Sequence, residues 1–316
     1  MQRNILILVG GGALLAALAG LHMAEQYFPM LGVWIFLGLT LTLGMGHGAL
    51  DAALLVGQFK PYSNALAYAG LYLGLVVSSG WLLSMSIDIA LIALILMSVW
   101  HFGELHSSSL ATRLVVGGAS VMVPLLVSND ALAALVKPLL GGVGGGRLDA
   151  WWLWSGMAMV WLLGLVVWLI YAAAGQARAR QMAASQGGFL LNHPLFSAAV
   201  ETLCIVCLNL ALSPLLAFSL YFGLWHSVAH MARVQRAVAI HRRSNSTSLI
   251  VVIAAAVLVT AALLALLWWW LAGQTWLPSA AQLSSAPALQ WLVVALAAVT
   301  LPHLILVGYS RRWLGG

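Results

Sequence analysis

The chain has 316 residues, of which 63% are hydrophobic and only 6% carry a formal charge. Ordinary soluble domains hold about 45–50% apolar and about 25% charged residues, so this composition excludes a soluble globular protein. The net charge of +6 does not indicate a nucleic-acid partner, because the basic residues lie in short segments between apolar runs, where they orient helices in a membrane.

Apolar runs of 18 or more residues recur along the chain, and each predicts a transmembrane helix. We expect an all-α fold, a polytopic transmembrane bundle of about ten helices that forms one integral membrane domain over residues 1–316. The first span could instead be a signal peptide, but its length favours a retained helix. In chain order the expected spans are 4–22, 31–56, 64–84, 87–105, 113–128, 151–174, 196–213, 215–232, 248–272 and 288–309.

The basic residues predict the orientation of these spans. With a cytoplasmic N-terminus, the loops on the outer side hold only Lys137 and Arg147 of the 13 basic residues. This asymmetry follows the positive-inside rule, so both termini are expected in the cytoplasm. The segments on the inner side hold the other basic residues: Arg3, Lys60, Arg113, Arg178, Arg180, Arg233, Arg236, Arg242, Arg243, Arg311 and Arg312.

Histidines occur in the second, fourth, eighth and tenth spans, all of which run from the outside to the inside in this topology. Each lies in the cytoplasmic half of its helix, so the imidazoles are expected in one layer. Glu201 of the seventh span falls in the same layer, while Asp51 and Glu104 lie about one turn nearer the cytoplasm. The histidines of this layer are His47, His101, His226, His230 and His303.

These polar residues predict a metal site. An ionisable group at the bilayer centre costs about 2.5–3.5 kcal/mol on the insertion scale, so it persists when it is paired, hydrated or bound to metal. His226 and His230 are four residues apart and share one helix face, as a two-ligand clamp requires. A single intramembrane histidine is often a helix–helix hydrogen-bonding group, but histidines at matched depth on several helices favour a metal. Imidazole suits Zn, Cu, Fe and Ni, which leaves the metal open.

Metal-bound imidazoles usually donate their second N–H to a carboxylate or a carbonyl. Asp51, Glu104 and Glu201 are the expected partners of this kind. The C-x-x-C pair of Cys204 and Cys207 stands without a second pair, so we expect these cysteines to be small buried apolar residues and not ligands.

Four segments make the chain resemble the Brp/Blh family of membrane β-carotene 15,15′-dioxygenases, found beside bacterial and archaeal rhodopsins. They are GMGHGALD at 44–51, WHFGE at 100–104, YFGLWHSVAH at 221–230 and LPHL at 301–304. After WHFGE the chain continues with Leu105 and His106, where a small and then an acidic residue would be expected. This departure concerns the surroundings of Glu104 and not His101.

The resemblance implies a non-haem Fe(2+) enzyme of a bacterial or archaeal cell membrane. It would cleave the central double bond of β-carotene with O₂ to two all-trans-retinal molecules, and a rhodopsin would receive the retinal. Carried over by motif, the catalytic metal ligands are His47, His101, His226 and His230, with His303 as a fifth ligand or a supporting group.

A polyene offers no hydrogen bonds, so an apolar tunnel near the histidine layer would have to position it by shape. Each tunnel candidate could equally be an ordinary helix-packing residue. The candidates are Met45, Trp100, Phe102, Tyr221, Phe222, Trp225 and Met231.

Other functions are weighed against this one. A membrane lipid hydroxylase or desaturase would show several clustered histidine boxes, whereas this chain has one H-x-x-x-H. A transporter would arrange its ionisable groups as a column across the membrane, not as one layer. A retinal-binding opsin would need a lysine within a span, but Lys60 and Lys137, the two lysines of the chain, lie outside the expected spans.

Overall fold

The computed structural model describes residues 16–28, 31–44, 48, 51, 62–104, 109–127, 151–183, 194–241 and 286–313, and every regular element in them is helical. The expected all-α fold is therefore confirmed for this part of the chain. The expected span 248–272 and the start of the first span lie outside it. The elements are a helix at 16–27, α2 (Leu31–Leu39), η1 (Thr40–Gly44), α4 (Tyr62–Ser84), α5 (Ile87–Gly103), α6 (Leu110–Val127), α8 (Trp151–Ala183), α9 (Pro194–Ala211), α10 (Pro214–Ser219), η3 (Leu220–Ser227), α11 (Val228–His241) and α14 (Ala286–Trp313).

Within the described residues, four helices are long and apolar enough to cross a membrane: Ala67–Ser84, Leu110–Val127, Ser155–Ala174 and Pro214–Val234. Three further apolar helices, over Ile87–Gly103, Ala198–Ala211 and Val293–Tyr309, are shorter. The outer faces carry large apolar side chains, such as Val77 and Val160, each 70% exposed. Such a surface is stable against lipid, which indicates a membrane-associated protein. The full set of ten spans and the side of each terminus stay predictions.

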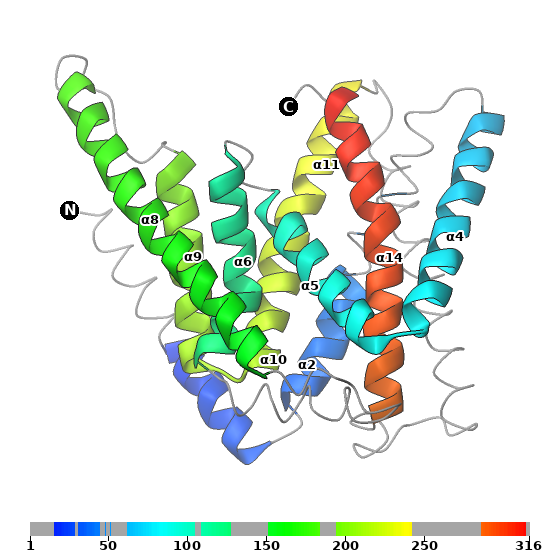
Figure 1. Ribbon diagram of the computed structural model, residues 1–316, viewed down its shortest axis with the longest axis horizontal. Helices are drawn as coiled ribbons and strands as arrows, with labels where there is room; N and C mark the ends of the chain where they lie inside the picture. Colours follow the sequence, from blue (N-terminus) through cyan, green and yellow to red (C-terminus); the bar gives the residue numbers. More distant parts are fainter. Residues whose placement is uncertain are drawn as a thin grey trace.

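The helix α5 lies in the middle of the bundle (Figure 1). It packs against α6 and α14, while α6 also packs against α8 and α9, and α14 against α4. Only Met85 and Ser86 separate α4 from α5, so these two helices form a tight hairpin. In Figure 1, α11 and α14 run in the same direction and end at the same side of the molecule. This arrangement brings helices that are distant in sequence around the end of α5.

Glycines let the backbones of α5 and α6 approach each other closely. A Cβ atom built on Gly117 would lie 1.9 Å from the carbonyl oxygen of Val99, and one on Gly103 would lie 2.1 Å from that of Arg113. Neither position can hold a side chain without moving a helix, as is usual where membrane helices meet at small residues. The contact fixes the end of α5, which carries His101.

A proline inside α14 leaves a backbone carbonyl group that a side chain of α4 contacts. Pro302 has no N–H, so the carbonyl group of Ala298, four residues earlier, loses its intrahelical partner. The hydroxyl group of Ser79 on α4 can donate to this carbonyl oxygen at 3.2 Å, and it shares its one hydrogen with the carbonyl groups of Leu75 and Val76 in its own helix, at 2.5 and 3.2 Å. The next residue of α4, Gly80, leaves room for the Ala298 side chain. Backbone groups need such partners in an apolar environment.

The chain segment of α10, η3 and α11 is one continuous rod with a π-helical middle. Ser213 caps its N-terminus by accepting from the backbone N–H of Leu216, and Pro214 occupies the first turn. In η3 the Ser227 hydroxyl donates to the carbonyl of Phe222, five residues earlier, at 2.7 Å. π-helical turns are rare and occur frequently at functional sites.

The predicted burial of the two cysteines is wrong. Cys204 and Cys207 are both exposed on the surface of the bundle. The buried face of α9 holds Glu201, Ile205 and Asn209, and the cysteines lie on the opposite face of the helix. They remain free thiols on an outward-facing surface.

Candidate functional site

Four of the five histidines predicted to share one layer are buried side by side. His101 comes from α5, His226 from η3, His230 from α11 and His303 from α14, and each is at most 5% exposed. The ring centroid of His101 lies 4.8 Å from the centroids of His226 and His303, and 5.6 Å from that of His230. The fifth, His47, lies outside the described residues. We call these four side chains the histidine cluster.

The H-x-x-x-H pair presents both rings on one side of its helix. The centroids of His226 and His230 are 6.1 Å apart and the ring planes differ by only 19°. The Nε2 atoms of His226 and His101 lie 3.2 Å apart. The pair predicted from sequence spacing thus has a third imidazole, from another helix, beside it.

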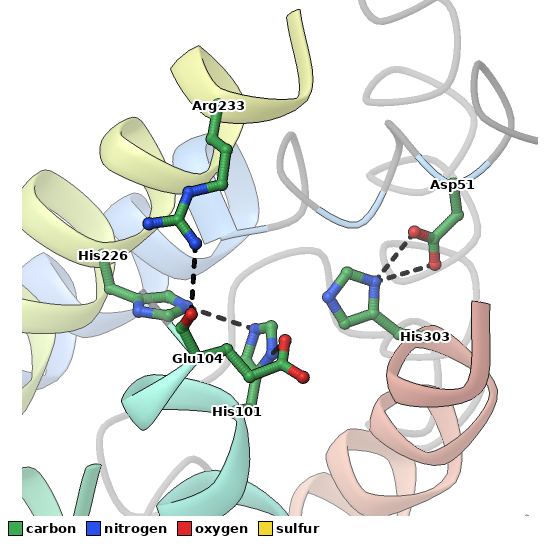
Figure 2. A network of polar contacts seen from close by, with 6 residues as sticks. All are labelled: Asp51, His101, Glu104, His226, Arg233 and His303. Atoms are coloured by element: carbon green, nitrogen blue, oxygen red, sulfur yellow. Dashed lines mark hydrogen bonds and ion pairs between the residues drawn. The ribbon is translucent and has the colours of Figure 1, made fainter. Parts of the chain in front are cut away.

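Asp51 contacts the opposite end of the cluster, as Figure 2 shows. The Nδ1–H group of His303 donates to Oδ1 and Oδ2 of Asp51 at 2.8 and 2.9 Å. The hydroxyl group of Tyr72, on α4, donates to Oδ2 of the same carboxylate at 2.7 Å. Asp51 therefore binds a histidine 252 residues away in the sequence.

Glu104 lies beside His101 at the end of α5. Its Oε2 atom is 3.7 Å from Nδ1 of His101, and both side chains are buried. The guanidinium group of Arg233 on α11 donates to the backbone carbonyl of Glu104 at 3.1 Å (Figure 2). This bond satisfies a carbonyl group at a helix C-terminus, where intrahelical donors run out.

Aromatic side chains cover one side of His226. The ring of Phe102 lies edge-on to it at 4.8 Å, and the ring of Phe222 is stacked with it at 6.4 Å. Tyr221 packs edge-on against Phe102 and donates its hydroxyl hydrogen to Glu201 at 3.1 Å. Phe218 is stacked on Phe222 at 5.6 Å. We call the side chains of Phe102, Phe218, Tyr221 and Phe222 the aromatic wall. The aromatic wall thus places apolar rings beside the imidazole of His226.

The other tunnel candidates lie further out. Trp100 and Trp225 are 42% and 56% exposed on the surface of the molecule, and Met231 is half-buried. Met45 lies outside the described residues. One cavity of the molecule opens where the helix at 16–27 and α2 meet the junction of α9 and α10, and no histidine of the cluster lines it. The tunnel itself stays a prediction.

The donor set of the cluster fits a metal ion. Imidazole nitrogens bind zinc at about 2.0–2.1 Å, so two neighbouring ligand nitrogens lie about 2.8–3.0 Å apart at octahedral angles and about 3.3–3.4 Å apart at tetrahedral angles. The Nε2 atoms of His101 and His226 are 3.2 Å apart, between these two separations and within hydrogen-bond distance of each other. Among the described residues no three or more His, Cys, Asp or Glu side chains already enclose one metal position. The described part of the site therefore supplies one pair of imidazole nitrogens close together, from His101 and His226, with the rings of His230 and His303 next to it.

Fold and site together define a membrane-associated helical protein built around buried imidazoles. A family model described as "Beta-carotene 15,15'-dioxygenase" matches residues 38–310. The chain belongs to this family, and the resemblance drawn from the four sequence segments is confirmed. A protein named "Beta-carotene 15,15'-dioxygenase" from an uncultured marine bacterium, 66A03, is 22% identical over 293 residues, which cover 90% of this chain and 95% of that protein. No solved structure matches the chain.

Three residues that contact the site were not expected there from the sequence. They are Tyr72, Phe218 and Arg233. Tyr72 had a usable signal, because a tyrosine within an apolar span needs a partner for its hydroxyl group. Phe218 and Arg233 had none, since one is an aromatic residue in an apolar run and the other belongs to a basic segment.

Proposed function

We propose that this protein cleaves the central 15,15′ double bond of β-carotene with O₂ and releases two all-trans-retinal molecules. The observation that carries the proposal is the family match over residues 38–310, within which the buried histidine cluster falls. The cluster would supply what an oxygenase of a hydrocarbon needs, a group of metal ligands in apolar surroundings.

We further propose Fe(2+) as the metal. His101, His226 and His230 would hold it with His47, and His303 would be a fifth ligand or a supporting group. Iron(2+), when bound, supplies the centre that activates O₂. The protein's part is to hold neutral imidazoles close together and to fix their rings through hydrogen bonds to other groups. Asp51 has this role for His303, and Glu104 lies in position to have it for His101.

The aromatic wall of Phe102, Tyr221, Phe222 and Phe218 would form part of the substrate surface. β-Carotene is a hydrocarbon, so apolar contacts and shape have to position its central bond. The wall also keeps water from the side of His226 that it covers, where three aromatic rings lie within 6.4 Å of the imidazole.

The bilayer would deliver the substrate. A rigid carotenoid is about as long as the hydrocarbon core is thick, ~30 Å, so an enzyme within the membrane avoids extracting it. We propose a multi-pass protein of a bacterial or archaeal inner membrane with both termini in the cytoplasm. The retinal product would pass to a rhodopsin in the same membrane.

The alternatives account for less of the molecule. A His-lined transporter would need polar groups along a path, whereas the four histidines of the cluster pack against one another. Another membrane metal oxidase that acts on lipid would use the same imidazoles. The family match favours the carotenoid over such a substrate.

Expression in a β-carotene-producing bacterium tests the activity. We expect the orange colour to fade and retinal to accumulate, and neither to happen with His226→Ala. His22→Ala, at an exposed position in the helix at 16–27, is the matched control and should cleave like the wild type. Unchanged colour with well-expressed wild-type protein would refute the proposed reaction. Elemental analysis should find about one iron per chain, and stoichiometric zinc with undiminished activity would reject iron.

A further inference from the structure

Tyr72, Asp51 and His303 form a hydrogen-bonded chain that joins three separate parts of the sequence. Tyr72 donates to Oδ2 of Asp51 at 2.7 Å, and Nδ1–H of His303 donates to Oδ1 at 2.8 Å. The carboxylate and the imidazole are 3% exposed each. In Figure 2 the second ring nitrogen of His303 points away from Asp51 and toward His101.

The chemistry of the three groups fixes the direction of these bonds. An ionised carboxylate only accepts hydrogen bonds, so both of its neighbours must donate. The phenol has a single hydrogen, and it is used on Asp51. A neutral imidazole has one N–H, and the bond to Asp51 places it on Nδ1. The lone pair of His303 is therefore on Nε2, the nitrogen that faces the histidine cluster.

We propose that Tyr72 is a positioning residue that acts through Asp51 on His303, and that His303 belongs to the metal-binding set through Nε2. The inference rests on the proposed function in that it needs a metal at the cluster. The hydroxyl group of Tyr72 donates to one oxygen of the Asp51 carboxylate and thereby holds this carboxylate in one orientation. Asp51 in turn holds the imidazole ring and its tautomer, as carboxylates commonly do for metal-bound histidines.

A purely structural role for Tyr72 makes different predictions. Its hydroxyl group could simply tie α4 to the rest of the bundle, which the Ser79–Ala298 bond to α14 already does. In that case its removal would lower stability and leave metal affinity unchanged. A positioning role requires that the effect on metal affinity depend on Asp51 and His303.

Metal titration separates the two roles without any measurement of turnover. Metal-free wild type, Tyr72→Phe, Asp51→Asn and the double variant are titrated in detergent with Co²⁺ alone, and the visible ligand-field spectrum is recorded. We expect Tyr72→Phe to weaken Co²⁺ binding about 10-fold and to shift the spectrum, at the lower end of the range for outer groups of metal sites. The double variant should bind no more weakly than Asp51→Asn. Tyr171→Phe, at a 72% exposed position on α8, should match the wild type.

Two results overturn the inference. One is Co²⁺ affinity and spectrum in Tyr72→Phe equal to those of Tyr171→Phe, and the other is full additivity in the double variant. A second cycle, of Asp51→Asn against His303→Ala, covers the case in which Tyr72→Phe does not fold. There we expect no further loss of affinity beyond His303→Ala alone, and additive losses refute the chain. Failure of the wild type to bind any metal would instead refute the metal site of the proposed function, so the two failures are distinguishable.

Discussion

The buried histidines are the residues at which binding of a metal and ordinary packing differ most clearly. Replacing His101, His226 or His230 by alanine should abolish cleavage and lower bound iron, because each removes a proposed ligand. Replacing a residue that only supports a ligand typically lowers metal affinity or activity about 10–100-fold, so Asp51→Asn and Glu104→Gln should keep measurable activity. Product analysis by chromatography and elemental analysis of the purified variants give the two readouts.

Packing histidines would respond differently to the same changes. Alanine would then lower the thermal midpoint without a selective effect on iron, and asparagine or glutamine would restore function as hydrogen-bonding substitutes. Full turnover by well-folded His226→Ala or His230→Ala would rule out the proposed ligand set. His303→Ala decides the role of His303. A loss of cleavage as complete as with His226→Ala makes it a ligand, and a partial loss makes it a supporting group.

The histidine cluster illustrates what residue-level reasoning can predict and where it ends. The charge asymmetry of the loops gave four spans a common direction, and from this followed the shared depth of histidines far apart in sequence. The partner of Asp51 did not follow, because helix spacing reveals only neighbours within a turn or so, such as His47. The bond to His303 depends on how α14 is placed against the rest of the bundle.

At the level of helices, the contact between α5 and α6 should be sensitive to a single methyl group. Gly117→Ala would place a carbon atom 1.9 Å from the Val99 carbonyl oxygen, so one helix has to move. Overpacking of this kind typically costs about 1–3 kcal/mol. We expect a lower thermal midpoint and less bound iron, because α5 carries His101.

A glycine in open space provides the control for that substitution. No neighbouring atom lies within 4 Å of a Cβ built on Gly164 of α8. Gly164→Ala should be neutral or stabilise the helix by up to about 1 kcal/mol. If Gly117→Ala melted like Gly164→Ala and kept its iron, the close approach of the two backbones would be refuted.

The hydrogen bond from α4 to α14 can be tested through the proline that creates the need for it. Ser79→Ala leaves the Ala298 carbonyl without its donor from α4, and we expect a loss of about 0.5–1.5 kcal/mol in unfolding free energy. In a Pro302→Ala background the helix supplies its own N–H, so the same change should cost less. Denaturation in detergent measures this cycle.

The exposed neighbour of Ser79 is the matched control. Ser78 donates within its own helix, to the carbonyl groups of Gly74 and Leu75, and Ser78→Ala should leave the unfolding free energy within about 0.5 kcal/mol. Equal costs of Ser79→Ala with and without Pro302 would show that the bond does not compensate for the proline.

Helix positions followed from the sequence more readily than helix geometry. The expected spans 64–84 and 87–105 correspond to α4 at Tyr62–Ser84 and α5 at Ile87–Gly103, since apolar length and the Ser86 cap mark their ends. The π-helical turns of η1 and η3 were not expected. In a run that is apolar on every face, hydrophobic periodicity carries no sign of a change from i→i+4 to i→i+5 bonding.

For the whole molecule, the decisive prediction concerns topology. The charge asymmetry places both termini in the cytoplasm, so a fluorescent-protein fusion at the C-terminus should glow and an alkaline phosphatase fusion there should be inactive. Fusions in the segment around Lys137 should give the reverse pattern. An external C-terminus would overturn the number of spans and, with it, the shared depth assigned to the histidines.

Composition alone predicted a helical protein in contact with lipid, because few other environments tolerate such an apolar surface. Composition could not predict which helices pack against one another. Uniformly apolar helices have no strongly polar face to indicate which side meets which neighbour, and small residues decide the matter locally, as Gly103 and Gly117 do.

The π-helical segment η3 makes the site depend on chain length as well as on chemistry. Each residue of an α-helix advances the chain by about 100° around the axis, and a π turn takes in about one residue more than an α turn. The π turn of this rod therefore absorbs a residue that a regular α-helix would convert into a rotation of about 100°. If the segment became a regular α-helix with all its residues kept, the helix upstream would be out of phase with His226 by about 100°. Deleting one outward-facing residue, such as Leu224, would remove that mismatch, so the deletion and a change to α-helix compensate each other. The position of the imidazole against its aromatic wall thus depends on the number of residues between Pro214 and His226 and on the π conformation together.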